Sequence, residues 1–278
     1  MAGHWTLDDI AWGSFTPARV DPDVLRAVKA ASMVEANSAD YVSYLNNVFA
    51  DDPDMVARIG VWGEEERQHG EALARWASLA DQTWHFAPRL ASFRANYRLP
   101  VDAAESVRGS RAGELLARCV VECGTSSFYS AIRDATDEPL LKEICHRIAG
   151  DEFRHYKLFY DGLQRYDGRD RLSLIARLKV AFGRVQEADD DELSVAYWCA
   201  NVENTPDAAP YDRKACATAY ELRATRLYRY GHVARGLFMI ARAIGINPQG
   251  RIVGLLSRGV WYMLQVRTRR LQRMAASA

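Results

Sequence analysis

Two glutamates that are each followed three residues later by a histidine lie on the apolar stripe of a strongly periodic helical pattern. The two pairs are Glu66 with His69 and Glu152 with His155. Residues three or four apart lie on one face of a helix, and here that face also carries the apolar residues that should meet the core. An unpaired carboxylate in a core is costly. The chain is therefore restricted to folds in which both pairs are neutralised inside the protein.

Two further helical stretches each place a single glutamate, Glu35 or Glu122, on an otherwise apolar stripe. The four predicted helices cover residues 21–50, 52–81, 101–134 and 138–168. Successive stripe glutamates are separated by 31, 56 and 30 residues. This spacing predicts two antiparallel helix pairs joined by a longer, irregular or short helical link over residues 85–100. Such a plan is that of a four-helix bundle with one crossover.

Strand signals are weak throughout, so the predicted fold class is all-α, a four-helix bundle with additional C-terminal helices. These further helices are predicted over residues 171–188, 192–202, 211–230, 232–244 and 249–275, with a clear loop over residues 204–211. The predicted organisation is an N-terminal segment over residues 1–20, the bundle over residues 21–168, and C-terminal helices over residues 169–278 that pack on the bundle. Together these parts are expected to form one domain.

Two divalent cations would offset the four buried carboxylates and use the imidazoles as neutral nitrogen ligands. Four glutamates and two histidines from four helices are the ligand set of di-iron and di-manganese carboxylate bundles. The predicted metal ligands are Glu35, Glu66, His69, Glu122, Glu152 and His155. Oxygen and imidazole ligands suit iron or manganese better than zinc, so two iron ions per chain are expected, with manganese or a mixed pair as alternatives. Glu65 and Glu64 compete with Glu66 for its role, and some of these groups would instead form salt bridges or face solvent if no metal binds.

Several segments resemble the soluble acyl-acyl carrier protein desaturases, a family of ferritin-like di-iron carboxylate proteins. "WGEEERQHGEAL" and "ICHRIAGDEFRHYKLF" are similar to the two ExxH helices of that family, "VVECGTSSF" to its Glu-x-x-Thr segment, and "MVEAN" to the segment of its first glutamate ligand. The resemblance covers about residues 21–168. It implies a di-iron, O2-dependent oxidoreductase that removes two hydrogens from an acyl chain. It also implies an acyl carrier protein or another acyl carrier, a ferredoxin-type electron donor and a homodimer.

The same resemblance implies roles for two residues that are not ligands. Thr125 would lie beside the oxygen pocket as a hydrogen-bond donor or proton relay, unless its hydroxyl simply bonds the carbonyl four residues back. Asp151 would orient a histidine or carry electrons inward, unless it is an exposed neighbour. Other readings of the motifs stay open: an aldehyde-deformylating, N-oxygenating or tRNA-hydroxylating di-iron enzyme, an iron-binding protein of ferritin or rubrerythrin type, or a bundle that only binds a partner.

Charge is distributed unevenly along the chain. After Glu221 there are eleven arginines and no acidic residue, whereas the preceding part has 36 acidic and 25 basic residues. The last arginines are Arg251, Arg258, Arg267, Arg269, Arg270 and Arg273. They could meet an acidic carrier protein, anionic lipid or RNA, or form a solvated helix face that the acidic body balances.

The remaining composition points to a cytoplasmic protein. The chain has five cysteines with no CxxC pair, and its first residues lack the basic start and apolar run of a signal peptide. Two apolar stretches near the end contain arginine and are shorter than the roughly 20 residues that a membrane-spanning helix needs. No transmembrane segment is therefore predicted, although a helix that lies on a membrane surface stays open.

Overall fold

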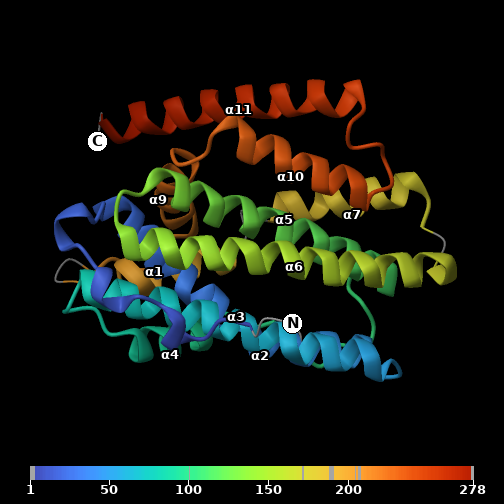
Figure 1. Cartoon of the computed structure of the whole chain (residues 1–278), viewed down its shortest axis with the longest axis horizontal. Helices are drawn as coiled ribbons and strands as arrows, with labels where there is room; N and C mark the ends of the chain where they lie inside the picture. The colour runs from blue at the N-terminus through green and yellow to red at the C-terminus, as the bar shows by residue number, and fades with distance from the viewer. Residues whose placement is uncertain are drawn as a thin grey trace.

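The computed structural model describes residues 4–99, 101–170, 172–187, 191–203, 205 and 208–276. Over this part of the chain the protein is helical and contains no strand. The predicted fold class, an all-α bundle with additional C-terminal helices, is confirmed. Figure 1 shows the long helices stacked in layers that run roughly along the longest axis of the molecule.

The bundle consists of two helix pairs. In the first pair, α1 (Pro22–Ala36) and α2 (Ser38–Val48) pack against α3 (Pro53–Ala80). In the second pair, α5 (Arg111–Ala135) packs along α6 (Pro139–Asp170). The two pairs meet where α3 packs against α6. The apolar faces of the two helix pairs therefore meet in the middle of the bundle.

The predicted helix over residues 21–50 is interrupted at Asn37. The Asn37 amide donates to the Val34 carbonyl at 3.1 Å and ends α1, and α2 restarts at Ser38, whose hydroxyl donates to the Gly63 carbonyl of α3 at 2.8 Å. Asparagine and serine favour such local bonds over an uninterrupted helix. The interruption comes two residues after Glu35, so the last turn of α1 positions that side chain.

The predicted helix over residues 101–134 was too long at its start. α5 begins at Arg111 because the Ser110 hydroxyl accepts a hydrogen bond from the Gly113 amide at 3.0 Å and caps the helix. Gly109, with φ of 80°, supplies the left-handed backbone of the preceding turn. The residues before it form turns rather than helix.

The predicted link over residues 85–100 contains a short helix, α4 (Phe86–Asn96), in line with the helical alternative. The N-terminal segment forms three short 3-10 turns, and Arg147 of α6 holds it by donating to the Asp9 carbonyl at 2.8 Å. Of the predicted loop over residues 204–211, residues 204, 206 and 207 lie outside the described part of the chain.

The C-terminal helices cover the bundle. α8 (Asp191–Asn201) and α9 (Arg213–Thr225) pack on α1, whereas α7 (Leu174–Gln186) and α10 (Tyr230–Ala243) pack on α5. The last helix, α11 (Arg251–Ala276), contacts α9 and α10 and forms the outermost layer at the top of Figure 1.

The single helix predicted over residues 211–230 was too long at its end. α9 ends at Thr225, and α10 starts at Tyr230. His232 separates the two helices because its Nδ1 atom accepts a hydrogen bond from the Arg229 amide at 3.0 Å and caps α10.

The core contains two apolar clusters with a polar layer between them. Along α3, Trp62 belongs to one cluster and Leu73 to the other, and Glu66 and His69 lie between these two residues. α6 repeats the arrangement with its own ExxH pair. The polar layer therefore lies inside the bundle, part-way along its helices.

Two further observations bear on the chemistry of the chain. All five cysteines are buried and have free thiols. Of the helices that the structure describes, none has both the length and the apolar character needed to cross a bilayer.

Candidate metal centre

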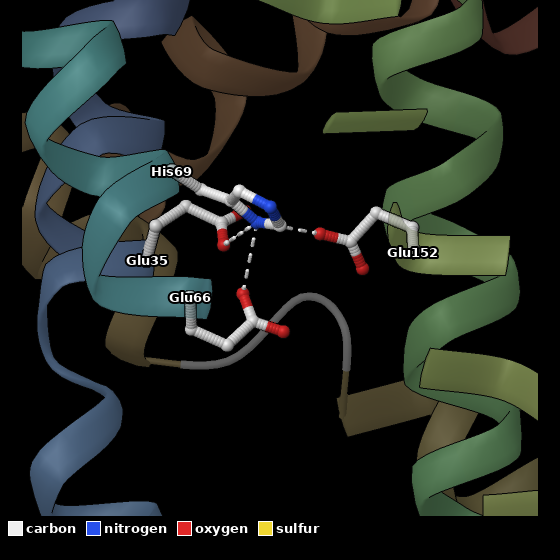
Figure 2. Close-up of side chains that lie close together, drawn as sticks. All are labelled: Glu35, Glu66, His69 and Glu152. Carbon is white, nitrogen blue, oxygen red and sulfur yellow. Dashed lines mark ion pairs between the residues drawn. The ribbon is translucent and has the colours of Figure 1, made fainter. Parts of the chain in front are cut away.

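Six side chains from four helices converge in the polar layer, and they are the six predicted metal ligands. They form two groups whose ligand atoms lie within 4.8 Å of one another. The groups are Glu35, Glu66, His69 and Glu152, and Glu66, Glu122, Glu152 and His155. Each of these residues is at most 7% exposed. Figure 2 shows the first group, in which carboxylates surround the His69 ring.

Glu66 and Glu152 belong to both groups, and each aims one carboxylate oxygen at each histidine. Oε2 of Glu66 lies 3.5 Å from Nδ1 of His69, and Oε1 lies 3.1 Å from Nδ1 of His155. Oε1 of Glu152 lies 3.3 Å from Nδ1 of His69, and Oε2 lies 3.9 Å from Nδ1 of His155. Carboxylates placed in this way can bridge two adjacent cations.

The other two glutamates each serve one group. Oε2 of Glu35 lies 3.8 Å from Nδ1 of His69, and Oε2 of Glu122 lies 3.7 Å from Nδ1 of His155. Each group therefore contains one histidine, one carboxylate of its own and two shared carboxylates. The two halves of the centre are related by an approximate two-fold symmetry of ligand type.

The outer nitrogen of each histidine meets a carboxylate from the other ExxH helix. Nε2 of His69 lies 3.0 Å from Oδ2 of Asp151, and Nε2 of His155 lies 2.7 Å from Oε2 of Glu65. When Nε2 carries the proton, Nδ1 is left with a free lone pair that faces the centre. Such outer carboxylates fix the tautomer and the ring orientation of histidine ligands.

The N-terminal segment adds a further layer outside Asp151. The Trp5 indole donates to Oδ2 of Asp151 at 2.7 Å, and its ring stacks on His69 with centroids 6.0 Å apart. Arg154 donates to Oδ1 of Asp151 at 2.5 Å. His4 lies on the solvent side of this layer, where its Nδ1 is 2.8 Å from Nη2 of Arg154 and its Nε2 is 3.4 Å from Oδ2 of Asp151. Asp151 is therefore held as an ionised acceptor for His69.

Buried polar atoms without a hydrogen-bond partner mark the middle of the site. Among the described residues they include Nδ1 of His69 and of His155, Oε1 of Glu152 and both carboxylate oxygens of Glu122. Buried groups of this kind are expensive and rare in folded proteins. These five atoms belong to the two ligand groups, and divalent cations would satisfy them while offsetting the carboxylate charge. The residues present therefore fit a pair of metal ions.

Burial and mutual repulsion distort the acid–base behaviour of these groups. The pKa of Glu35 is raised well above its ordinary value, first by burial and then by the charge of Glu66. Burial likewise raises the pKa of Glu122. Burial opposes protonation of His69 and His155, yet the surrounding carboxylates outweigh it and raise both histidine pKa values well above normal. Protons and divalent cations would therefore compete for the same buried atoms.

Two hydroxyl groups donate to carboxylates of the centre. The Thr125 hydroxyl lies 2.5 Å from Oε2 of Glu152, closer than the 3.3 Å that separates it from the Val121 carbonyl four residues back. The Tyr129 hydroxyl donates to Oε1 of Glu35, and burial raises the pKa of Tyr129, which keeps it a donor. Thr125 thus contacts a shared carboxylate, and its role in a reaction stays a prediction.

Trp5 and Tyr129 were not predicted as contributors to this site, and Glu65 was predicted only as an alternative ligand to Glu66, not as the partner of His155. A signal for Glu65 was available, because it directly precedes Glu66 just as Asp151 directly precedes Glu152. No pattern indicated that Trp5 would reach Asp151, 146 residues away in the sequence.

Comparisons with known proteins add no family assignment. No protein-family model matches this sequence, and no curated protein matches it. The geometry of the centre and its motifs are therefore the features that bear on function.

Proposed function

We propose that this chain is a di-iron, O2-dependent oxidoreductase that removes two hydrogens from an acyl chain, in the manner of the acyl-acyl carrier protein desaturases. The observation that carries the proposal is the sharing of Glu66 and Glu152 by two buried ligand groups of the same composition. A site for a single metal ion would not need two carboxylates that each contact both histidines, whereas a site for two ions would. Manganese or a mixed pair would occupy the same ligands.

The ligand assignment follows the two groups. His69 and Glu35 would hold one ion, His155 and Glu122 the other, and Glu66 and Glu152 would bridge them. When bound, two irons would supply the activation of O2 with two electrons from a reductant. This composition of oxygen and imidazole ligands is typical of oxygen-activating di-iron proteins.

The surrounding residues would each perform a separate task. Asp151 and Glu65 hold the histidine rings with their Nδ1 atoms toward the ions. Thr125 holds Oε2 of Glu152 and can pass a proton to or from that oxygen. Trp5 shields Asp151 from solvent and, with it, forms a continuous hydrogen-bonded path from the N-terminal segment to His69.

The acyl substrate is supported by the sequence segments that resemble the desaturase family, which extend beyond the ligands into their flanks. The same resemblance supports an acyl carrier protein or another acyl carrier as the substrate's partner, a ferredoxin-type electron donor and a homodimer. The five free cysteines without a CxxC pair support a cytoplasmic location. Each of these is part of the proposal.

The first experiment measures metal content. The full chain, loaded with Fe(II) without oxygen and desalted, should retain about two irons per chain. His155→Ala should lose iron because it removes the nitrogen ligand of one group. His146→Ala, an exposed histidine on the same helix, should load normally. A folded wild-type protein that retains no iron would exclude the metal centre.

The second experiment measures chemistry. The reduced, iron-loaded protein is given O2 and saturated acyl-acyl carrier protein, and the acyl product is weighed by mass spectrometry. Loss of two hydrogens supports the proposal. Gain of an oxygen atom, or iron oxidation with no change in the acyl chain, would overturn the desaturase assignment and favour another di-iron oxygenase or an iron-binding protein.

A further inference from the structure

An apolar stripe runs along the outward side of α11, opposite the side that packs on the protein. Val253 and Ser257 face inward and are buried. The outward residues are between 47% and 72% exposed, and they are Ile252, Leu255, Leu256, Tyr262, Met263 and Val266. Their spacing of three and four residues places them on one face of the helix. Exposed apolar side chains in such an ordered row indicate a binding surface.

The stripe is shallowly hollowed along its first half. Ile252, Leu256 and Met263 line this hollow together with Gly259, whose missing side chain lowers the surface between them. α11 is also the outermost helix at the top of Figure 1, where the remaining layers all lie on one side of it. A flat surface could therefore lie along the outer side of α11 without meeting another element in that view.

Arginines border this stripe. Arg251, Arg258 and Arg269 are exposed and lie seven and eleven residues apart, so they fall near one edge of the stripe after two and three turns. Arg267 lies near the opposite edge, where it forms an ion pair with Glu221. Glu221 is the last acidic residue of the sequence, so the charged side chains of α11 and of the residues from 222 onward are all arginines.

We propose that α11 docks this protein on the surface of an anionic lipid bilayer. The stripe would enter the boundary between headgroups and acyl chains, and the bordering arginines would meet lipid phosphates. Helices that combine an apolar face with Lys and Arg bind membranes in this orientation, parallel to the surface. Tyr262 on the stripe suits this depth because tyrosine is enriched at membrane–water interfaces.

Charge favours this occupant over a second copy of the chain. A dimer formed through the stripe would bring two arginine-bordered, acid-free helices together, and like charges across an interface are costly. An anionic bilayer neutralises the same arginines. The proposal concerns a different face of the molecule from the metal centre and does not depend on the proposed enzyme activity.

The test is flotation of the full chain with vesicles. Vesicles of phosphatidylcholine that contain phosphatidylserine should bind the protein, vesicles of phosphatidylcholine alone should bind it weakly, and high salt should release it. Leu255→Ser should weaken binding by about ten-fold, because it removes an inserted apolar side chain. Arg258→Gln and Arg269→Gln should each weaken binding by about five-fold.

Matched control variants lie on α3, which Figure 1 shows on the far side of the bundle from α11. Val61 on α3 is 61% exposed, so Val61→Ser makes a change like that of Leu255→Ser away from α11. Arg58→Gln, also on α3, removes one exposed arginine. Both variants should bind vesicles like the wild type.

Three outcomes would overturn the proposal. Equal binding to the two kinds of vesicle would show that α11 does not recognise anionic lipid. A wild-type dimer that Leu255→Ser converts to a monomer, as measured by light scattering, would make the stripe a contact between chains. Loss of affinity for an acidic carrier protein in the α11 variants, without any vesicle binding by the wild type, would assign the stripe to that protein. Far-ultraviolet circular dichroism confirms that each variant is folded.

Discussion

Nε2 of His69 on α3 lies 3.0 Å from Oδ2 of Asp151 on α6, and the reverse contact joins His155 of α6 to Glu65 of α3 at 2.7 Å. Each ExxH helix therefore orients the histidine of the other. The acidic residue that does so directly precedes a shared glutamate in both cases. One short motif, acid-Glu-x-x-His, would thus supply a shared carboxylate ligand and a nitrogen ligand, and it contains the carboxylate that contacts the opposite ring.

Neutralising either outer carboxylate should weaken metal binding without removing a ligand. For Asp151→Asn and Glu65→Gln we expect a loss of metal affinity of about ten-fold or more, because the histidine is less firmly held and less basic. Competition between the protein and a chelator for Co(II) measures the affinity. Asp161→Asn, which changes an exposed carboxylate on α6, should have no effect. Unchanged affinity in both test variants would contradict the positioning role.

Thr125→Val should alter the electronic environment of the centre while leaving its metal content unchanged. The substitution removes the hydroxyl that donates to Oε2 of Glu152 and keeps a side chain of similar size. We expect a shifted visible spectrum of the Co(II)-loaded protein. Thr125→Ser retains the hydroxyl and should restore the wild-type spectrum. Identical spectra for all three proteins would show that the hydroxyl does not act on the ligand.

Gly70→Ala should destabilise the bundle next to the metal centre. A Cβ atom at Gly70 would lie 2.6 Å from the Ala36 amide nitrogen and 2.7 Å from its Cβ, where α3 passes the end of α1. Overpacking of this kind costs about 1–3 kcal/mol of unfolding free energy. Gly60→Ala on the same helix meets no atom within 4 Å and should instead stabilise by up to about 1 kcal/mol. Urea unfolding of the two variants provides the comparison, and equal midpoints would rule out close packing at Gly70.

Acid should weaken the link between α1 and the end of α3. Lys29 donates to Oδ2 of Asp81 at 2.6 Å. Burial opposes ionisation of Asp81, yet the ammonium of Lys29 lowers its pKa from 3.8 to about 2. Because the folded pKa is the lower one, the stabilisation is complete above the unfolded value of about 3.9 and is lost as the pH falls through the folded value of about 2.

The variant Asp81→Asn isolates this contribution. Burial lowers the pKa of Lys29 despite the pair, but lysine stays charged over this acidic range, so only the carboxyl titrates. Urea midpoints measured from mildly acidic to strongly acidic buffer should fall less steeply in Asp81→Asn than in the wild type. Asp161→Asn should follow the wild type. Parallel curves for wild type and Asp81→Asn would assign the acid sensitivity to other groups.

The long, regular helices could be predicted because their apolar periodicity and their caps agree. Pro53 and Asp52 start α3 one residue from the predicted position, and α6 extends two residues past its predicted end at 168. The same stripes predicted which six side chains would meet. Periodicity within a helix is enough for this because it fixes which side chains share a face.

The helix interruptions and the contacts of Asp151 with distant residues were harder to predict from the sequence. The break at Asn37 depends on a hydrogen bond from Ser38 to α3, and the late start of α5 depends on the Ser110 cap. The helical sequence pattern continues through both places, so the positions where the helices end and begin depend on the tertiary contact or on the cap geometry. Trp5 was missed for the same reason, because its partner Asp151 lies on a distant helix.

The crossed contacts of His69 and His155 mean that neither helical hairpin holds a finished half-site. A peptide that contains α3 alone would carry Glu66 and His69 but lack the Asp151 that turns the ring, and a peptide of α6 would lack Glu65. The protein should consequently bind cations only when the two hairpins are assembled, and the bound ions would in turn hold the two hairpins together.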